Sequence, residues 1–535
     1  MADPSPVVGL PNSEWIEIKN ISGVAMNLQN WKVGDLSSQS GNLPSYILKP
    51  DSFLILCSSG SLAALSQFGP AISVSSFPSL DNDGDQIFIK AANGRIIHAV
   101  SYSTQWYQND LKKEGGWSLE LKDSRRPCTI SNNWSASMDP RGGTPGQRNS
   151  IESVITDRDG PICLNAFAAD SLTILLNFDE PLDSAMAILR SNYGLPGFAI
   201  SGVSCLPPLF NQVQLKLGRP LNRFHIYELN IGAVRDCEGN ASIQQSMYIG
   251  LAEIAEVGDW IINEILFDPR PNAYDYVEFR NISSRILDAS KLFIANRNTN
   301  DQLSNIKALS PSPFNVFPGE YYVVTENIES LQLQYWVPDR KRIFSLGLPS
   351  FPDDKGIVIA LNSLGTILDE LRYDRKWHFA LIRDPEGVSL ERIDSLAATS
   401  DPGNWHSASS SAGYGTPGYR NSQSRLPVEN PALISIQPKF FSPDNDGRDD
   451  FLSIDYQLPD PGYVANITVL NNRAMPVKHL VRNGIMGTKG KWVWDGLDDQ
   501  QRSLPIGTYI IFTELFNLEG RKLQFKQAVV LARPL

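Results

Sequence analysis

The sequence predicts an all-β protein built from several β-sandwich domains in a row. Three observations lead to this prediction. At 535 residues the chain is longer than a single hydrophobic core supports. Its 39 glycines and 36 prolines are spread between short apolar runs, which is typical of many strands joined by turns. A long internal repeat also gives the same succession of strands twice.

The repeat is most evident in two closely similar octapeptides. Residues 143–150 read Gly-Thr-Pro-Gly-Gln-Arg-Asn-Ser, and residues 415–422 read Gly-Thr-Pro-Gly-Tyr-Arg-Asn-Ser. Residues 14–22 likewise match residues 275–283, and the matches keep the same order along the chain. We therefore expect one domain fold to occur twice.

Short strands are predicted within each copy. Residues 15–19 alternate between polar and apolar side chains, as in a strand with one buried face. Residues 53–56 form a continuous apolar run after a proline, and residues 321–324 do the same in the other copy. The pair Asn93-Gly94 lies between two runs rich in isoleucine and predicts a β-hairpin.

These separated motifs, in this order, resemble the lamin tail domain. That family has an immunoglobulin-like β-sandwich fold. The resemblance covers residues 1–150, which we call the first repeat, and residues 256–424, which we call the second repeat. It implies an immunoglobulin-like β-sandwich in each. With the two regions described below, we expect four tandem immunoglobulin-like β-sandwich domains.

One strand of the second repeat has no counterpart in the first. Residues 260–265 open the second repeat, but Met1 aligns with Leu266. A sandwich without this strand exposes an unpaired edge. We therefore expect the strand, and an export signal, to lie upstream in a longer protein, because the first residues lack the features of a signal peptide. The alternative is a true start with a degenerate first strand.

Residues 151–252 resemble the bacterial immunoglobulin-like spacer modules of surface-layer type. Residues 178–183 read Phe-Asp-Glu-Pro-Leu-Asp after an apolar strand, and residues 235–240 read Arg-Asp-Cys-Glu-Gly-Asn. Such modules set the distance between functional domains, so the resemblance implies a spacer.

Residues 430–535 resemble the C-terminal immunoglobulin-like domain of gliding-motility and surface proteins of Bacteroidota, which is related to the flagellar-hook-cap domain. The resemblance rests on the acidic loop at residues 441–451 and on Trp-Val-Trp-Asp-Gly at residues 492–496. It implies that this domain addresses the protein to type IX secretion machinery. An extracellular or outer-surface location would follow.

The acidic loop is a candidate Ca²⁺ site. Five side chains with oxygen ligands lie within seven residues around a glycine: Asp444, Asn445, Asp446, Asp449 and Asp450. Hard cations prefer several such oxygens. The alternative is a solvated turn, since aspartate, asparagine and glycine also favour turns.

The five cysteines suggest one disulfide bond. Cys57 aligns with Thr325, and Cys128 aligns with Thr399. Because both positions change together between the repeats, we predict a Cys57–Cys128 disulfide, as befits an exported protein. Two independent buried thiols are the alternative. The sequence leaves the pairing open for the remaining three, Cys163, Cys205 and Cys237.

Known catalytic signatures are absent from the sequence. Its five histidines are scattered singly, and it contains no nucleophile elbow, phosphate loop or dinucleotide fingerprint. The formal charge of −11 disfavours nucleic acid as a partner. No apolar run reaches the roughly 18 residues that a transmembrane segment needs.

The sequence therefore favours a non-enzymatic secreted or cell-surface protein that acts in adhesion or display. Its expected partners are secretion machinery, through the C-terminal domain, and a surface glycan or protein ligand. We expect no cofactor besides Ca²⁺. Two alternatives stay open. The chain is the accessory binding region of a larger exported hydrolase with an upstream catalytic domain, or it is a glycan-binding protein that uses exposed tryptophans.

Overall fold

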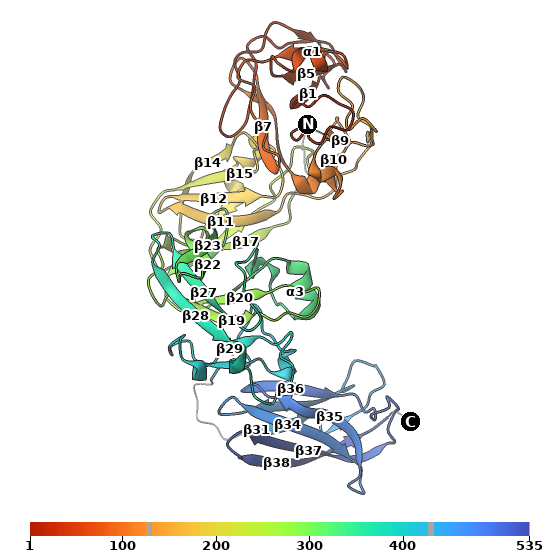
Figure 1. Cartoon of the computed structure of the whole chain (residues 1–535), viewed down its shortest axis with the longest axis vertical. Coiled ribbons are helices and arrows are strands. Elements are labelled where there is room, and N and C mark those ends of the chain that lie inside the picture. Colours follow the sequence, from red (N-terminus) through yellow and green to blue (C-terminus); the bar gives the residue numbers. More distant parts are fainter. Residues whose placement is uncertain (127–130, 426–432, 534–535) are drawn as a thin grey trace. The chain divides into compact units, whose positions relative to one another are not determined.

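The computed structural model describes residues 1–126, 131–425 and 433–533, and these residues fold mainly into β-strands (Figure 1). This confirms the predicted all-β class. The chain forms two compact units, Met1–Leu251 and Ala252–Leu535. The α-helices in the described residues are short: α1 (Leu62–Leu65), α2 (Ser184–Ala187) and α3 (Ile328–Gln334).

The first repeat consists of small sheets. The first is β1 (Trp15–Lys19), β5 (Phe53–Cys57) and β6 (Ala71–Ser73), and the second is β3 (Lys32–Gly34), β7 (Gly84–Lys90) and β8 (Ile96–Ser103). Two strand pairs complete it: β2 (Met26–Asn27) with β4 (Ile47–Leu48), and β9 (Leu119–Leu121) with β10 (Trp134–Ala136). Strands β7 and β8 form the predicted hairpin, with Gly94 at its turn in the left-handed region (φ +87°).

The second repeat has larger sheets. The first is, in order, β26 (Ile343–Ser345), β25 (Tyr321–Thr325), β20 (Tyr276–Asn281), β19 (Trp260–Leu266), β29 (Leu390–Arg392) and β30 (Trp405–Ser407). The second is β23 (Leu303–Ala308), β22 (Leu292–Arg297), β27 (Lys355–Asn362) and β28 (Ile367–Asp374). A small third sheet holds β18 (Ala252–Glu253), β21 (Ile286–Asp288) and β24 (Asn315–Val316).

The strands of the two repeats correspond in the register that the sequence alignment predicts. Trp15 pairs with Cys57 where Tyr276 pairs with Thr325. The exceptions include β23, at the edge beside β22, and β19, which pairs with both β20 and β29. Among the described residues of the first repeat, no strand lies between the equivalent strands β1 and β9.

The other two regions are also two-sheet structures. Between the repeats lie β11 (Cys163–Asp170), β12 (Thr173–Phe178), β15 (Gln212–Leu217) and β14 (Ile200–Leu206), with a second sheet of β13 (Tyr193–Gly194), β16 (Tyr227–Ile231) and β17 (Gln245–Ile249). The C-terminal region has β31 (Leu433–Gln437), β33 (Leu452–Gln457) and β36 (Lys489–Trp494). Its other sheet is β32 (Phe440–Phe441), β38 (Lys522–Leu531), β37 (Gly507–Asn517), β34 (Tyr463–Leu470) and β35 (Pro476–Ile485).

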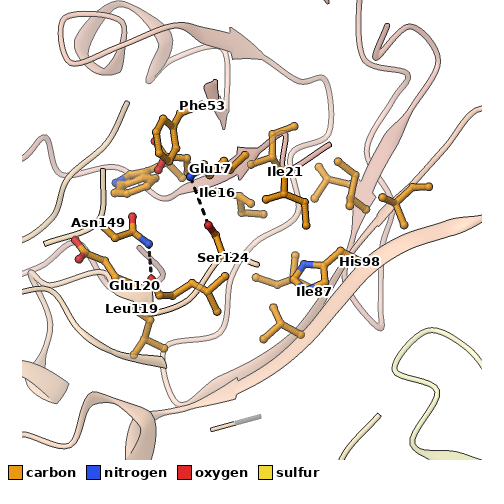
Figure 2. Close-up of a pocket in the computed structure, with 18 of the residues that line it drawn as sticks. Ile16, Glu17, Ile21, Phe53, Ile87, His98, Leu119, Glu120, Ser124 and Asn149 are labelled. Atoms are coloured by element: carbon orange, nitrogen blue, oxygen red, sulfur yellow. Dashed lines mark hydrogen bonds between the residues drawn. The ribbon is translucent and has the colours of Figure 1, made fainter. Parts of the chain in front are cut away.

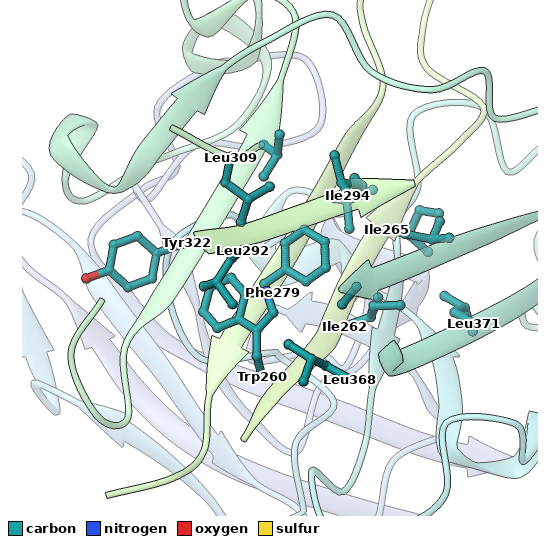
Figure 3. Close-up of a cluster of buried hydrophobic side chains, with 14 of the residues drawn as sticks. Trp260, Ile262, Ile265, Phe279, Leu292, Ile294, Leu309, Tyr322, Leu368 and Leu371 are labelled. Carbon is teal, nitrogen blue, oxygen red and sulfur yellow. The ribbon is translucent and has the colours of Figure 1, made fainter. Parts of the chain in front are cut away.

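The core of the second repeat lies between its two main sheets (Figure 3). Trp260 on β19 stacks on Phe279 of β20, with ring centroids 5.3 Å apart. Leu292 and Ile294 approach from the opposite sheet, on β22. The core clusters of the other regions lie within residues 430–535, 151–252 and 1–150. The core of the second repeat also includes Ala255, one residue before its predicted start, and the four predicted domain boundaries stay a prediction.

Removing the Phe279 side chain tests this core. Phe279 is fully buried, so Phe279→Ala leaves a cavity, and we expect a loss of about 3–5 kcal/mol in the stability of the second repeat. Differential scanning calorimetry of the whole chain measures it. The control is Leu364→Ala, whose side chain is 72% exposed, with an expected change within about 0.5 kcal/mol. Equal losses in both variants would contradict the core assignment.

Candidate functional site

Three buried glutamates form a hydrogen-bonded network in the second repeat, on the adjacent strands β19, β20 and β29. Glu264 accepts hydrogen bonds from the Tyr276 hydroxyl (2.6 Å) and the Thr416 amide (2.8 Å). Glu278 accepts one from the Gly418 amide. Glu391 accepts hydrogen bonds from the hydroxyl of Ser422 (2.8 Å) and the backbone amide of Gln423 (2.8 Å). The repeated octapeptide is therefore held to the sheet by carboxylates.

The geometry of this network indicates that at least one of its carboxyl groups is protonated. The Thr416 hydroxyl lies 2.8 Å from both Glu264 and Glu391, and a hydroxyl has only one proton to donate. Burial raises the pKa of Glu264, Glu278 and Glu391 above the usual value. A neutral carboxyl can donate to Thr416 while the other accepts, which satisfies both bonds.

The first repeat has part of the same network. Glu120 accepts hydrogen bonds from the Thr144 hydroxyl (2.8 Å) and the Ser150 amide (2.7 Å). Glu17 accepts one from the Gly146 amide, and burial raises its pKa to about 7. None of the described residues of the first repeat takes the place of Glu264, because none of its described strands lies between β1 and β9.

A mostly apolar cavity of 390 Å³ lies in the first repeat (Figure 2). Ile16 and Glu17 of β1 lie on one side of it, and Leu119 and Glu120 of β9 on another. The ring of His98 also faces it, and burial lowers the pKa of this imidazole. Among the residues that line the cavity, the Lys19 ammonium donates a hydrogen bond to the Ser124 hydroxyl (3.4 Å).

The structure brings three of the five predicted Ca²⁺ ligands together. Carboxylate oxygens of Asp444, Asp446 and Asp450 lie within 4.8 Å of one another, whereas the Asp449 carboxylate is outside this group; the structure does not add Asn445 to the group as a ligand. The carboxylate of Asp450 accepts hydrogen bonds from the backbone amides of Asp444, Asn445 and Gly447. The loop geometry thus holds a compact oxygen cluster, and Ca²⁺ binding stays a prediction.

The predicted Cys57–Cys128 disulfide is wrong, because Cys57 is a free thiol in the structure. Cys57 is fully buried beside Trp15 and Leu65, where it packs as a small apolar side chain and its pKa is raised by burial. Cys128 lies outside the described residues. Of the cysteines left open, Cys205 is also a free thiol and Cys237 is disulfide-bonded.

The second repeat shows why the paired replacement misled. Thr325 donates a hydrogen bond to the Asp275 carbonyl (2.9 Å), and Thr399 donates to the Asp369 carboxylate (2.5 Å). The two threonines thus bind different partners, so their joint exchange for cysteine does not require a contact between the two positions.

A second acidic cluster was missed by the sequence reasoning. Asp157, Glu180 and Asp236 present carboxylate oxygens within 4.8 Å of one another. Arg126 donates to Asp157 and to Glu238, both at 2.6 Å. Burial raises the pKa of Glu180 to about 8. The signal was present, because Glu180 and Asp236 belong to the two phrases that resemble surface-layer spacers.

Comparison with known proteins identifies a family for one part of the chain. Residues 1–104 match the model of the Lamin Tail Domain family. This first part is therefore similar to lamin tail domains, as its motifs predicted. No curated protein matches the chain. Among the described residues, no helix is long and apolar enough to cross a membrane.

Similar solved structures include the N-terminal part of the bacterial S-layer protein SbsC, at 16% identity and a TM-score of 0.16. The match covers 30% of this chain and 39% of that chain. A DUF4876 family protein from Bacteroides thetaiotaomicron matches at 14% identity, with 39% of this chain and 85% of that chain covered and a TM-score of 0.17. The Bacteroides ovatus mixed-linkage glucan utilization protein SGBP-B matches at 9% identity over 93% and 92%, also with a TM-score of 0.17. We build no functional argument on these distant matches.

The glutamate network predicts a pH-dependent stability. A carboxyl whose pKa is raised by folding binds its proton more tightly in the folded state, so stability falls as pH rises above the unfolded value. Burial raises the pKa of Glu391 to about 8. We expect the melting temperature of residues 252–535 to fall by several degrees from about pH 6.5, the ordinary pKa of histidine, to about pH 8, where folded Glu391 loses its proton.

Glu391→Gln tests the source of this fall. Its side chain is neutral throughout, so we expect a smaller decrease than in the wild-type chain, measured by calorimetry. The exposed Glu386 provides the matched control, Glu386→Gln, with the wild-type decrease. Buried His378 and His406, whose pKa values are lowered, titrate below this range. A flat wild-type profile would contradict the network.

The acidic loop predicts Ca²⁺ binding by the whole chain. Isothermal titration with CaCl₂ should give heat, and Asp446→Asn should lower the affinity about tenfold, because a ligand charge is lost. Glu519→Gln, at a side chain that is 76% exposed, is the control and should bind as the wild type does. Absence of heat, or equal affinity in wild type and Asp446→Asn, would contradict Ca²⁺ binding at this loop and favour the alternative of a solvated turn.

Proposed function

We propose that the chain is a non-enzymatic secreted or cell-surface protein that acts in adhesion or display. The observation that carries this proposal is an aromatic pair on the second repeat in which Trp336 is exposed and Tyr419 is half-buried. Trp336 is 67% exposed, and its ring packs edge-on against Tyr419, with centroids 5.0 Å apart. Large exposed aromatic side chains are typical of binding surfaces.

The position of this pair links it to the repeat. Tyr419 occupies the variable position of the repeated octapeptide, where the first repeat has Gln147. Its backbone is fixed by the glutamate network below it, since Gly418 donates to Glu278. Three residues before Trp336, on α3, the apolar side chain of Leu333 is 88% exposed. A rigid base under exposed rings suits binding to a flat surface such as a sugar ring or a protein face.

The domain organisation is part of the same proposal. The second repeat is a second lamin tail domain, supported by the strand-by-strand correspondence of β1 with β20, β5 with β25 and β9 with β29. Residues 151–252 act as an immunoglobulin-like spacer, supported by their two-sheet core. Residues 430–535 address the protein to a type IX-like secretion route, supported by the motifs named above. An extracellular or outer-surface location follows from that route.

Two alternatives to this proposal stay open: a glycan-binding protein and the accessory region of a larger hydrolase. The aromatic pair favours glycan as the ligand over protein, because both members of the pair, Trp336 and Tyr419, are uncharged aromatic rings. The chain would equally serve as the accessory binding region of a larger exported hydrolase. In that case the ligand of the Trp336 surface would be the polymer that the hydrolase degrades.

The aromatic pair predicts carbohydrate binding by the whole chain. We expect the wild-type chain to bind at least one polysaccharide on a glycan array, and Trp336→Ala to weaken that binding at least tenfold. Leu518→Ala, at another exposed apolar side chain (62%), should leave it unchanged. If the wild type binds no glycan, or if both variants bind equally well, the proposal for this surface is wrong.

A further inference from the structure

The second repeat has a central strand, β19, that has no counterpart among the described residues of the first repeat, and this difference leaves a groove. In the second repeat, β19 lies between β20 and β29 and all seven of its residues are buried. In the first repeat, the equivalent strands are β1 and β9, and the 390 Å³ cavity lies between them (Figure 2). The cavity therefore occupies the place that β19 fills in the other copy.

Met1 fixes the register of the groove. The Met1 amine donates to the Trp15 carbonyl (3.2 Å), and the Trp15 amide donates to the Met1 carbonyl (3.2 Å). In the second repeat, Leu266 pairs with Tyr276 in the same way. Met1 thus takes the position of Leu266, and the open stretch faces residues 16–20.

Several polar groups of the groove correspond to groups that bind β19. Tyr276 donates its hydroxyl proton to Glu264, but the equivalent Trp15 indole nitrogen is buried without a hydrogen-bond partner. Asn421 donates to the carbonyls of Asn263, on β19, and of Arg392, on β29. The equivalent Asn149 donates to Leu121 of β9 at 2.9 Å. The groove thus keeps donors arranged for a strand.

We infer that this groove is an acceptor site for a six-residue extended β-strand that lies outside residues 1–535. The strand runs antiparallel to β1 and pairs with residues 16–20, as β19 pairs with β20. It carries apolar residues at the positions of Trp260, Ile262 and Ile265, which fill the core. It carries a carboxylate at the position of Glu264, which accepts a hydrogen bond from the Trp15 indole N–H.

A second copy of this chain is a poorer donor. The matching sequence, β19, is fully buried in its own sandwich, where it pairs on both edges. It would have to leave that core, together with Trp260 and its stack on Phe279, to reach another molecule. An extended segment that has no core of its own bears no such cost. The inference is also independent of carbohydrate binding at Trp336.

The experiment uses a synthetic peptide, Trp-Ile-Ile-Asn-Glu-Ile, with the sequence of residues 260–265, added to the whole chain. We expect saturable binding by fluorescence anisotropy and slower hydrogen exchange at the amides of residues 16–20. The melting temperature of residues 1–251 should rise with peptide concentration. A scrambled peptide is the control, and equal binding of both peptides would overturn the inference.

A matched pair of variants tests the predicted contact. Trp15→Phe removes the indole donor and keeps an apolar ring, so its affinity for the Glu peptide should fall about tenfold, the worth of a hydrogen bond to a charged group. For a peptide with alanine in place of the glutamate, the Trp15→Phe variant and the wild-type chain should have the same affinity. Equal loss for both peptides would show that the carboxylate does not reach Trp15.

The source of the strand is tested by sedimentation. Without peptide, we expect the whole chain to stay monomeric as its concentration rises. Dimers that form with concentration and that the peptide dissociates would identify a second copy as the donor and overturn the assignment to an outside segment. Absence of peptide binding at millimolar concentration would overturn the acceptor site itself.

Discussion

The second repeat depends on one central strand and the carboxylate that it carries. β19 joins the strands β20 and β29 into one sheet, and Glu264 in its middle accepts three hydrogen bonds, from the hydroxyls of Tyr276 and Ser389 and from the Thr416 amide. A buried carboxylate is stable only when it is neutral or hydrogen-bonded. The closing octapeptide supplies one of those donors, the Thr416 amide, so the carboxylate on β19 helps to hold the end of the domain in place.

This arrangement explains the conservation of pattern between the two repeats without invoking catalysis. The threonine, the second glycine and the serine of the octapeptide each donate to a glutamate of the sheet in both copies. The same frame holds Tyr419 in place at the surface, under the exposed Trp336. The structural network and the proposed binding surface are therefore two faces of one segment.

The first repeat shows what happens when the central strand is lacking. Its sheets stay small, and the space between β1 and β9 becomes a cavity lined by apolar side chains and by the unpaired Trp15 nitrogen. The remaining donors still meet Glu17 and Glu120. Among the described residues the sheet edge at β1 is therefore open, and an open edge is where a sandwich accepts a further strand.

Local patterns in the sequence predicted the local structure well. The alternation in residues 15–19 and the turn at Asn93-Gly94 gave strands and a hairpin, because these depend on neighbouring residues only. The pairing of Cys57 was predicted wrongly. That two threonines of one repeat are both cysteine in the other does not mean that the two positions are in contact. The acidic cluster around Glu180 was not recognised, because its members are far apart along the chain.

The sequence by itself determined the all-β class, the repeat and the alignment of Met1 with Leu266, at the end of β19. These follow from periodicity and alignment, which need no knowledge of distance. Only the tertiary structure decided that Glu264, Glu278 and Glu391 share one buried network, that Cys57 is free, and that the absent strand leaves a groove with a partnerless donor. The physical reason is that burial and hydrogen bonding depend on which strands become neighbours, and strand neighbours are set by the whole sandwich.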